Sequence, residues 1–193
     1  SSLSISAGTV TGTPTNDDVG ANTVTISATD GTASVTTSYV LTVTNTNDAP
    51  TITSTADTTA EEDEAYSYTT TASDVDAGDT VTLTCTTVPS WLSCTAGALT
   101  GTPSNSDVGS HAVVITATDV AGATALDSFT IVVANANDAP TVTSTAVTTA
   151  TEDSVYTYTL TASDADTGDT LTMAGTTVPS WLTFTASTGV LTG

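Results

Sequence analysis

The 193-residue chain contains neither lysine nor arginine, although it carries 21 aspartates and glutamates and a single histidine. Its formal charge at neutral pH is −21, so no salt bridge between side chains can form. Nucleic acids and anionic membranes are bound through lysine and arginine, which neutralise phosphate. The composition therefore predicts that neither is a partner, and it excludes isopeptide cross-links that need lysine.

Long apolar runs and catalytic side chains are also scarce. No stretch reaches the length of a transmembrane helix, and Ser1–Ser4 lacks the basic and apolar regions of a secretory signal, which would have to lie outside this segment. His111 is the only histidine, and no serine sits in a glycine-flanked nucleophile turn. Paired carboxylates can hydrolyse glycosides, but the acids here recur in repeated turns, whereas an active site is normally unique. We expect neither membrane insertion nor enzymatic activity.

The chain repeats itself with a period of about 90 residues. Asn45–Pro50 returns as Asn135–Pro140, and Trp91 returns as Trp181. This spacing predicts the second half of a repeat in residues 1–48, a complete repeat in 49–138 and the first half of the next repeat in 139–193. We interpret the half-repeats as parts of a longer array. The alternative is that the head of one molecule completes the tail of another and builds a filament.

Within the complete repeat, strand-length runs alternate apolar and polar residues with period two. Clusters of Gly, Pro, Asn and Asp separate these runs, and no helical period is present, which predicts an all-β antiparallel sandwich for each repeat. Trp91 lies between inward-facing strands and is assigned to the core, with exposed stacking of Trp91 or Trp181 on a sugar as the alternative. The inward-facing sets are Tyr66, Tyr68, Thr70 and Ala72; Val81, Leu83 and Cys85; Val113, Ile115 and Ala117; and Phe129, Ile131 and Val133.

The chain has only two cysteines, Cys85 and Cys94, and both fall at inward-facing positions. Neither position is a cysteine in the neighbouring repeats, so the two occur together. We expect a disulfide between them, which indicates an oxidising, extracytoplasmic location; two buried thiols are the alternative. With two cysteines and one histidine, zinc and iron sites are not expected.

The acids gather at turns. Asp74–Asp79 reads Asp-Val-Asp-Ala-Gly-Asp and recurs as Asp164–Asp169, but the later glutamate of an EF-hand loop is missing. Two carboxylates about 4 Å apart repel by roughly 4 kcal/mol at an effective dielectric of 20, so such clusters need a cation, hydrogen-bond donors or open solvent. Ca²⁺ takes about six to eight oxygens, which a linker and the loops of two adjacent domains can supply together. The alternative is a set of ordinary solvated turns.

The order of the motifs resembles the dystroglycan-type cadherin-like repeat and the related putative-immunoglobulin repeats of large bacterial surface proteins. The motifs are Pro89–Leu92, Gly97–Pro103, Asp107–Gly109, Ala117–Asp119 and Asn137–Pro140. The resemblance implies seven-strand Greek-key sandwiches in tandem with Ca²⁺ at the junctions.

The cadherin pattern also implies the ligands. At the first junction they are Asn45, Asn47, Asp48, Asp74, Asp76 and Asp119. At the second junction they are Glu62, Asn135, Asn137, Asp138, Asp164 and Asp166. One departure is Asp107–Gly109, where cadherins carry an acid–basic–acid triplet, so a glutamate ligand is missing there.

Together these features predict a non-catalytic, extracellular segment of a bacterial surface protein, a calcium-rigidified stalk or filament with a role in cell adhesion. Its expected partners are neighbouring repeats of the same or identical chains, and a cell-surface or glycan ligand. One alternative is a carbohydrate-binding or spacer module of a secreted polysaccharide-degrading enzyme. The other is a self-assembling filament subunit built by head-to-tail completion of half-repeats.

Overall fold

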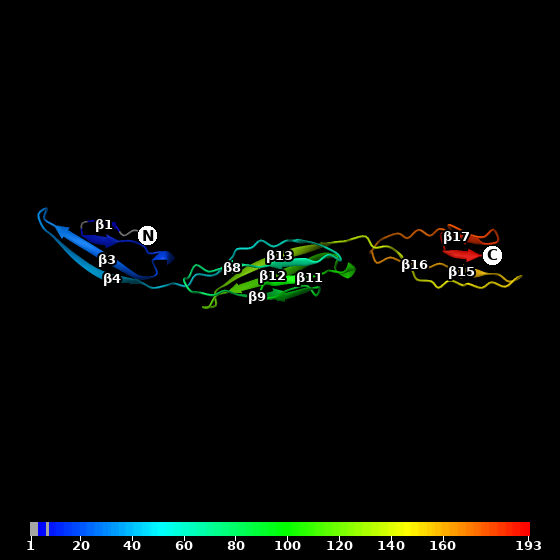
Figure 1. Cartoon of the computed structure of the whole chain (residues 1–193), viewed down its shortest axis with the longest axis horizontal. Helices are drawn as coiled ribbons and strands as arrows, with labels where there is room; N and C mark the ends of the chain where they lie inside the picture. Colours follow the sequence, from blue (N-terminus) through cyan, green and yellow to red (C-terminus); the bar gives the residue numbers. More distant parts are fainter. Residues whose placement is uncertain (1–3, 7) are drawn as a thin grey trace. The chain divides into compact units, whose positions relative to one another are not determined.

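The structure is a computed structural model that describes residues 4–6 and 8–193. Residues 1–3 and 7, which belong to the expected first half-repeat, lie outside the described residues. The described chain consists of β-strands joined by turns, with two single-turn 3₁₀ helices (Figure 1). In that part of the chain, no helix is long and apolar enough to cross a membrane. The predicted all-β class is confirmed.

The chain divides into two compact units. The first runs to Thr58 and also contains Tyr66–Gly101 and Ser110–Ile131. The second contains Thr59–Ala65, Thr102–Gly109 and Val132–Gly193. The described residues up to 48 form the N-terminal segment, residues 49–138 the central segment and residues 139–193 the C-terminal segment.

The N-terminal segment is dominated by a long antiparallel hairpin, β3–β4, whose register runs from Gly20 paired with Val43 to Thr29 paired with Ser34. Its turn is fixed by Asp30, whose Oδ1 accepts hydrogen bonds from the backbone N–H groups of Thr32 and Ala33 at 2.9 and 2.8 Å. These two bonds lower the pKa of Asp30, with Ala33 contributing most. The elements here are β1 (Ser4–Ser6), β2 (Thr9–Thr11), η1 (Asn16–Asp18), β3 (Gly20–Thr29) and β4 (Ser34–Val43).

The central segment forms two sheets, one with the strand order β6-β13-β12-β9 and one with the order β10-β11-β7, next to the short pair β5-β8. Strand β6 runs parallel to the end of β13, whereas β9–β12, β10–β11 and β11–β7 are antiparallel. Its elements are β5 (Thr51–Ile52), β6 (Thr59–Glu61), β7 (Tyr66–Thr69), β8 (Ala72–Ser73), β9 (Thr82–Thr87), β10 (Leu92–Thr95), β11 (Ala98–Gly101), η2 (Asn105–Asp107), β12 (Gly109–Thr118) and β13 (Thr124–Ala134).

The core of the central segment lies between these two sheets. Leu99 on β11 and Ile115 and Ile131 on the facing sheet are completely buried. Each such side chain contributes about 1.5–3 kcal/mol through its removal from water. The rings of Tyr68 and Phe129 meet edge to face across the sheets, with centroids 5.5 Å apart. The predicted sandwich is therefore confirmed, with the alternating residues of the strands facing inward.

Polar groups also cross this core. The hydroxyl of Tyr68 donates to Asp127 Oδ2 at 2.8 Å and lies 2.8 Å from the Ser54 hydroxyl.

A Cβ on Gly101 would clash with the carbonyl oxygen of Trp91, which explains why glycine ends the Leu-Thr-Gly motif. The same clash, with Trp181, would occur at Gly193.

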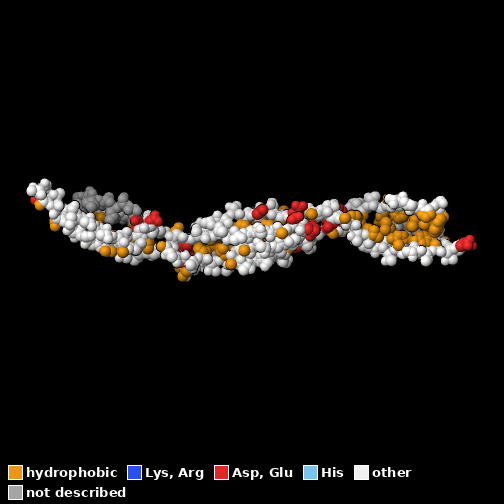
Figure 2. Space-filling view, in the orientation of Figure 1, with side chains coloured by type: hydrophobic (Ala, Val, Ile, Leu, Met, Phe, Trp, Pro, Cys, Tyr) orange, Lys and Arg blue, Asp and Glu red, His pale blue; other side chains and the backbone are white. Residues whose placement is uncertain are grey.

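The C-terminal segment repeats five strands of the central segment, whereas the stretches that match β6 and β9 form no strand in it. Its sheets have the orders β14-β16 and β15-β18-β17 and match β5-β8 and β7-β11-β10. Figure 2 shows its apolar side chains gathered in a broad exposed patch. Its strands are β14 (Thr141–Val142), β15 (Thr157–Thr159), β16 (Ala162–Ser163), β17 (Thr183–Thr185) and β18 (Val190–Thr192).

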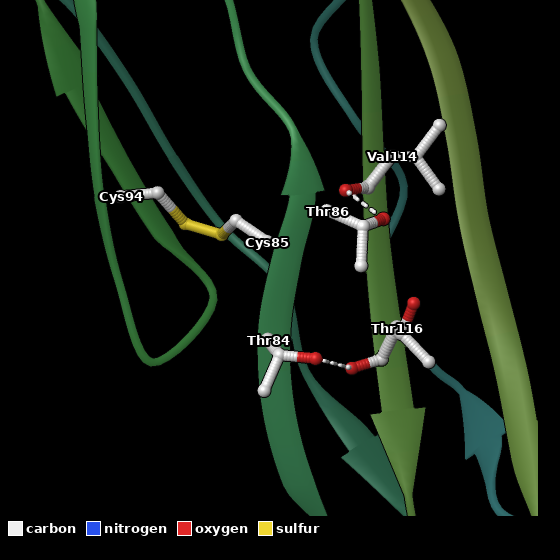
Figure 3. Close-up of a disulfide and its surroundings, with 6 residues drawn as sticks. All are labelled: Thr84, Cys85, Thr86, Cys94, Val114 and Thr116. Atoms are coloured by element: carbon white, nitrogen blue, oxygen red, sulfur yellow. Dashed lines mark hydrogen bonds between the residues drawn. A yellow bond between two sulfur atoms is a disulfide. The ribbon is translucent and has the colours of Figure 1, made fainter.

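A disulfide joins Cys85 on β9 to Cys94 on β10, with the two Cα atoms 6.4 Å apart (Figure 3). Because β9 and β10 belong to different sheets, the bond links the two layers of the sandwich. On the other side of β9, the Thr84 and Thr86 hydroxyls donate to the carbonyl oxygens of Thr116 and Val114.

The disulfide should stabilise the central segment by about 2.5–3 kcal/mol, because it closes a short loop in the unfolded chain. We expect the double variant C85A/C94A to lose this amount of free energy of unfolding. The measurement is urea denaturation followed by Trp91 fluorescence in a Trp181→Phe background. As a control, reductant added to the parent protein should reproduce the loss, and an unchanged unfolding midpoint would contradict the assignment.

Candidate metal centres

At the second junction, the linker after β13 is anchored on the acidic loop that follows β16. The backbone N–H of Asp138 donates to Asp166 Oδ2 at 2.7 Å. Glu62, in the turn that follows β6, approaches the same place because β6 pairs with the last residues of β13. Glu62, Asp138 and Asp166 each offer a carboxylate oxygen, and these oxygens lie within 4.8 Å of one another.

The acidic loop holds its own carboxylates together through its turn. The backbone N–H of Asp166 donates to Asp164 Oδ1 at 3.1 Å, and the N–H of Asp169 donates to the Asp166 carbonyl at 3.3 Å. Gly168 allows the reversal with a φ of 102°. Asp164, Asp166 and Asp169 thereby form a second group of oxygens within 4.8 Å. Asp166 belongs to both groups of carboxylates.

The carboxylate of Glu62 is buried without full hydrogen bonding. Glu62 is 2% exposed and Asp166 is 6% exposed, and Glu62 Oε2 has no hydrogen-bond partner. Burial raises the pKa of Glu62 against a backbone hydrogen bond from Ala136, and the charge of Asp138 raises it further. A buried, unpaired carboxylate oxygen is costly, and this chain has no lysine or arginine to balance it. The arrangement suits a bound divalent cation.

Two asparagines complete the cluster of side chains at the second junction. Asn135 Nδ2 donates to Asp166 Oδ1 at 2.9 Å. Asn105 Nδ2, from the 3₁₀ turn before β12, reaches Asp138 Oδ2 at 3.2 Å and Asp166 Oδ1 at 3.3 Å. Each carboxamide also carries an oxygen, which is a ligand type that Ca²⁺ accepts.

The first junction has the same design. The backbone N–H of Asp48 donates to Asp76 Oδ2 at 2.8 Å, and Asn16 Nδ2 donates to Asp48 Oδ2 at 2.8 Å. Asp74, Asp76 and Asp79 present oxygens within 4.8 Å of one another. Asp74 Oδ2 and Asp76 Oδ1 are buried without a hydrogen-bond partner.

This first cluster differs from the second in one respect. Among the residues that the structure describes, no glutamate joins Asp48 and Asp76 in the way that Glu62 joins Asp138 and Asp166.

Asp119 is held differently from Glu62. Asn47 Nδ2 donates to Asp119 Oδ2 at 2.8 Å, and the backbone N–H of Ala123 donates to Asp119 Oδ1 at 2.7 Å. The Asn47 bond is the largest cause of a lowered pKa at Asp119, opposed by burial. The ionised form of Asp119 is therefore favoured in the folded chain.

The structure brings together most of the residues proposed as ligands, with two exceptions. The Asn137 amide donates to the Asp138 carbonyl in its own linker, at 2.7 Å. Asn45 is exposed, and the structure records no hydrogen bond from its side chain to the acids. The residues brought together are Asn47, Asp48, Asp74, Asp76 and Asp119 at the first junction, and Glu62, Asn135, Asp138, Asp164 and Asp166 at the second.

Four residues of these clusters are not among the predicted ligands, namely Asn16, Asn105, Asp79 and Asp169. The signal for the two asparagines was present, since Asn16 and Asn105 lie 89 residues apart in matching Pro-Thr-Asn and Pro-Ser-Asn stretches. The neighbouring acid of that turn is used locally, because Asp107 Oδ2 accepts from the N–H and the hydroxyl of Ser104. At the departure Asp107–Gly109, the carboxylate therefore caps its own turn.

Comparison with known proteins gave one family and a common fold. The family model described as "Putative Ig domain" matches residues 49–134 and 139–193. No curated protein sequence gave a significant match.

Similar solved structures include the protocadherin gamma B4 extracellular domain, with a TM-score of 0.57, 22% identity and coverage of 98% of this chain and 37% of that one. Protocadherin gamma B7 extracellular cadherin domains 1–4 give a TM-score of 0.55 at 16% identity, covering 95% of this chain and 50% of that one. These likenesses show the fold alone.

An endo-fucoidan hydrolase of glycoside hydrolase family 107 is 27% identical over 69% of this chain and 22% of its own length. Its TM-score of 0.37 is too low to support an argument. The chain spans half or less of the length of these structures.

In chelator, acidification should stabilise the chain through Glu62. Because its pKa is higher in the folded than in the unfolded state, the folded chain takes up the proton first as the pH falls. The gain in the free energy of unfolding begins as the pH falls through the raised pKa and is complete below the ordinary value of 4.5. It is lost again as the pH rises. We expect Glu62→Gln to remove this part of the pH dependence of the melting temperature.

The control is Glu64→Gln, which changes an exposed acid two residues away and should melt like the parent. If the melting temperatures of Glu62→Gln and the parent changed with pH in the same way, burial would not be raising the pKa of Glu62.

Proposed function

Since the chain belongs to the family described as "Putative Ig domain", we propose that it is a non-catalytic structural and adhesive segment of a large extracellular surface protein. In this proposal, residues 1–48, 49–138 and 139–193 are successive parts of a tandem array of cadherin-like sandwiches. Calcium at the junctions holds the linkers against the acidic loops and stiffens the array. The partners are neighbouring repeats and a ligand on a cell surface or glycan.

The observation that carries this proposal is the buried carboxylate of Glu62, whose Oε2 has no hydrogen-bond partner and which faces Asp138 and Asp166. Carboxylate and carboxamide oxygens are hard ligands, which suit Ca²⁺ and Mg²⁺ and not zinc. Mg²⁺ requires near-ideal octahedral geometry and keeps several waters, whereas Ca²⁺ accepts many protein oxygens in flexible geometry. The crowded oxygens of these clusters therefore favour Ca²⁺.

The donor sets fit such an ion at both junctions. The ion would neutralise carboxylates that otherwise repel one another, and it would thereby tie each linker to the loop beneath it. At the second junction the holding residues would be Glu62, Asn105, Asn135, Asp138, Asp164, Asp166 and Asp169. At the first they would be Asn16, Asn47, Asp48, Asp74, Asp76, Asp79 and Asp119.

Two further observations support an extracellular setting. The Cys85–Cys94 disulfide is typical of proteins that fold in oxidising compartments. The similar protocadherin structures are described as extracellular domains. Enzymatic activity forms no part of the proposal, because the clustered acids sit in repeated junctions and each has a structural use there.

Calcium titrated into chelator-treated protein should bind, and Glu62→Gln should weaken binding at the second junction roughly tenfold, because affinity follows the number of charged ligands. The measurement is isothermal titration calorimetry, with Glu64→Gln as the matched control. Calcium at 100 times its Kd should add about 2.7 kcal/mol of stability for each site that only the folded chain forms. Absence of any calcium heat, with melting unchanged by chelator, would overturn the proposal.

Calcium should also protect the linkers from proteolysis. The chain has no trypsin sites, so the probe is an endoprotease that cleaves before aspartate, with Asp48 and Asp138 as the reporting positions. Chelation should expose the peptide bonds before Asp48 and Asp138 to the protease. The backbone N–H groups of these residues donate to the carboxylates of Asp76 and Asp166, which the ion would hold in place. Fragments are mapped by mass spectrometry.

Cleavage before Asp30 is the internal control and should not depend on calcium. The Asp30 carboxylate is held by backbone N–H groups of its hairpin turn and lies outside the proposed sites. Cleavage before Asp48 and Asp138 at equal rates with and without calcium would count against linkers held by the ion.

A further inference from the structure

The four-stranded sheet of the central segment has two edge strands that differ in length and charge. In the order β6-β13-β12-β9, strand β6 forms one edge and strand β9 the other. The outer side of an edge strand carries backbone donors and acceptors that can pair with a further strand. Both edges lie within the central segment, which carries both sheets of its sandwich.

The β6 edge is protected against such pairing. It has three residues, and its last residue, Glu61, is followed by Glu62, Asp63 and Glu64. Short length and charged side chains are means by which proteins keep an edge strand from pairing with another chain. A second copy of this chain carries the same acids and would be repelled from β6.

The β9 edge lacks this protection. It has six residues, and the stretch 81–88 that contains it has no charged residue, no proline and no glycine. The outward-facing Thr82, Thr84 and Thr86 are exposed. High β-propensity, low charge and the absence of proline characterise segments that pair readily with strands of other chains. In a chain with a formal charge of −21, a second copy can approach this edge without meeting carboxylates on it.

The contacts of β9 hold the strand in place and leave its outer backbone side open. In the part of the chain that the structure describes, β12 is the strand paired with β9. The hydroxyls of Thr84 and Thr86 donate to carbonyl oxygens of β12, so both are directed toward this inner neighbour (Figure 3). The inward-facing Cys85 is tied to β10 of the other sheet. A strand already fixed in this way loses less entropy when another strand adds to it.

The architecture has room for an added strand at this edge. The order β13-β12-β9 corresponds to the G-F-C order of immunoglobulin sandwiches. Constant-type immunoglobulin domains end this sheet at strand C, whereas variable-type domains continue it with two further strands. A sheet of this family can therefore be extended beyond the strand that β9 represents.

We propose that β9 is an interaction surface to which the β9 strand of a second copy adds in antiparallel orientation, so that two sheets become one. Such pairing uses the same patch on both copies and closes at the dimer. It places Asp79, which lies just before β9, at opposite ends of the pair, whereas parallel pairing would bring the two Asp79 side chains together. A six-residue strand is about 20 Å long, more than twice the Debye length of about 8 Å in physiological salt. The pairing joins separate chains side by side and goes beyond the role proposed for the junctions.

Two double variants of the full chain test this pairing. Thr84→Glu/Thr86→Glu places charges on β9, where they would face the same charges of the second copy. Ser128→Glu/Thr130→Glu is the matched control, because it adds the same charge at exposed positions of β13, an inner strand of the same sheet. Thermal melting checks that both variants fold.

Sedimentation velocity should show a concentration-dependent dimer, with twice the 19.1 kDa mass of the monomer, for the parent and for the β13 variant. In the β9 variant the Kd of the dimer should rise roughly tenfold, because like charges opposite one another on paired strands are destabilising. A parent that stays monomeric at every concentration would overturn the proposal. Association that is lost in the β13 variant and kept in the β9 variant would overturn it as well.

Hydrogen exchange on the parent locates the contact without any substitution. Outward-facing backbone N–H groups of residues 82–87 should exchange more slowly as the protein concentration rises, whereas exchange in β6 should not change. A dimer that forms without added protection in β9 would show that the chains meet through another surface, which would overturn the edge pairing.

Failure of the proposed function is recognised separately. Thr84 and Thr86 lie outside the acidic clusters, so the β9 variant should bind calcium like the parent. Calcium binding by a chain that never dimerises would overturn the edge pairing alone, whereas a dimer formed by a chain that binds no calcium would overturn the calcium proposal alone.

Discussion

The constraint on which the whole molecule depends is the absence of lysine and arginine to balance its carboxylates. Each aspartate and glutamate has to be stabilised by a backbone N–H, an amide, a hydroxyl, solvent or an ion. Asp30, Asp107 and Asp119 accept hydrogen bonds from their own turns and neighbouring amides. Glu62 and Asp76 keep buried oxygens without a partner, and these residues lie at the two junctions. The charge that the fold cannot satisfy internally is therefore concentrated where linkers meet loops.

The sequence was informative wherever a local pattern decides the structure. Alternation placed Val113, Ile115 and Ile131 in the core, and the 90-residue period identified equivalent loops in two places. The sites were harder to define because their ligands come from distant parts of the chain. Glu62 meets Asp138 only through the parallel pairing of β6 with β13, and no period of two or of 90 specifies that pairing.

Asparagine was the residue type that sequence reasoning judged least well. Asn16 and Asn105 sit in ordinary turn sequences, so their part in the clusters is visible only once the 3₁₀ turns are placed beside the linkers. Asn45 is the opposite case. The linker motif made it a predicted ligand, but its side chain is exposed.

The parallel pairing of β6 with the end of β13 has a mechanical consequence. These strands lie near the two ends of the central sandwich along the chain, and Thr59, Ala60 and Glu61 pair with Val132, Val133 and Ala134. A pulling force applied through the flanking linkers would act along this pair in opposite directions. Parallel strands loaded in this way resist by shear, with the bonds strained together, whereas a hairpin pulled at one end opens bond by bond like a zipper. The strand pair that brings Glu62 to the junction is thus also the element that would bear tension.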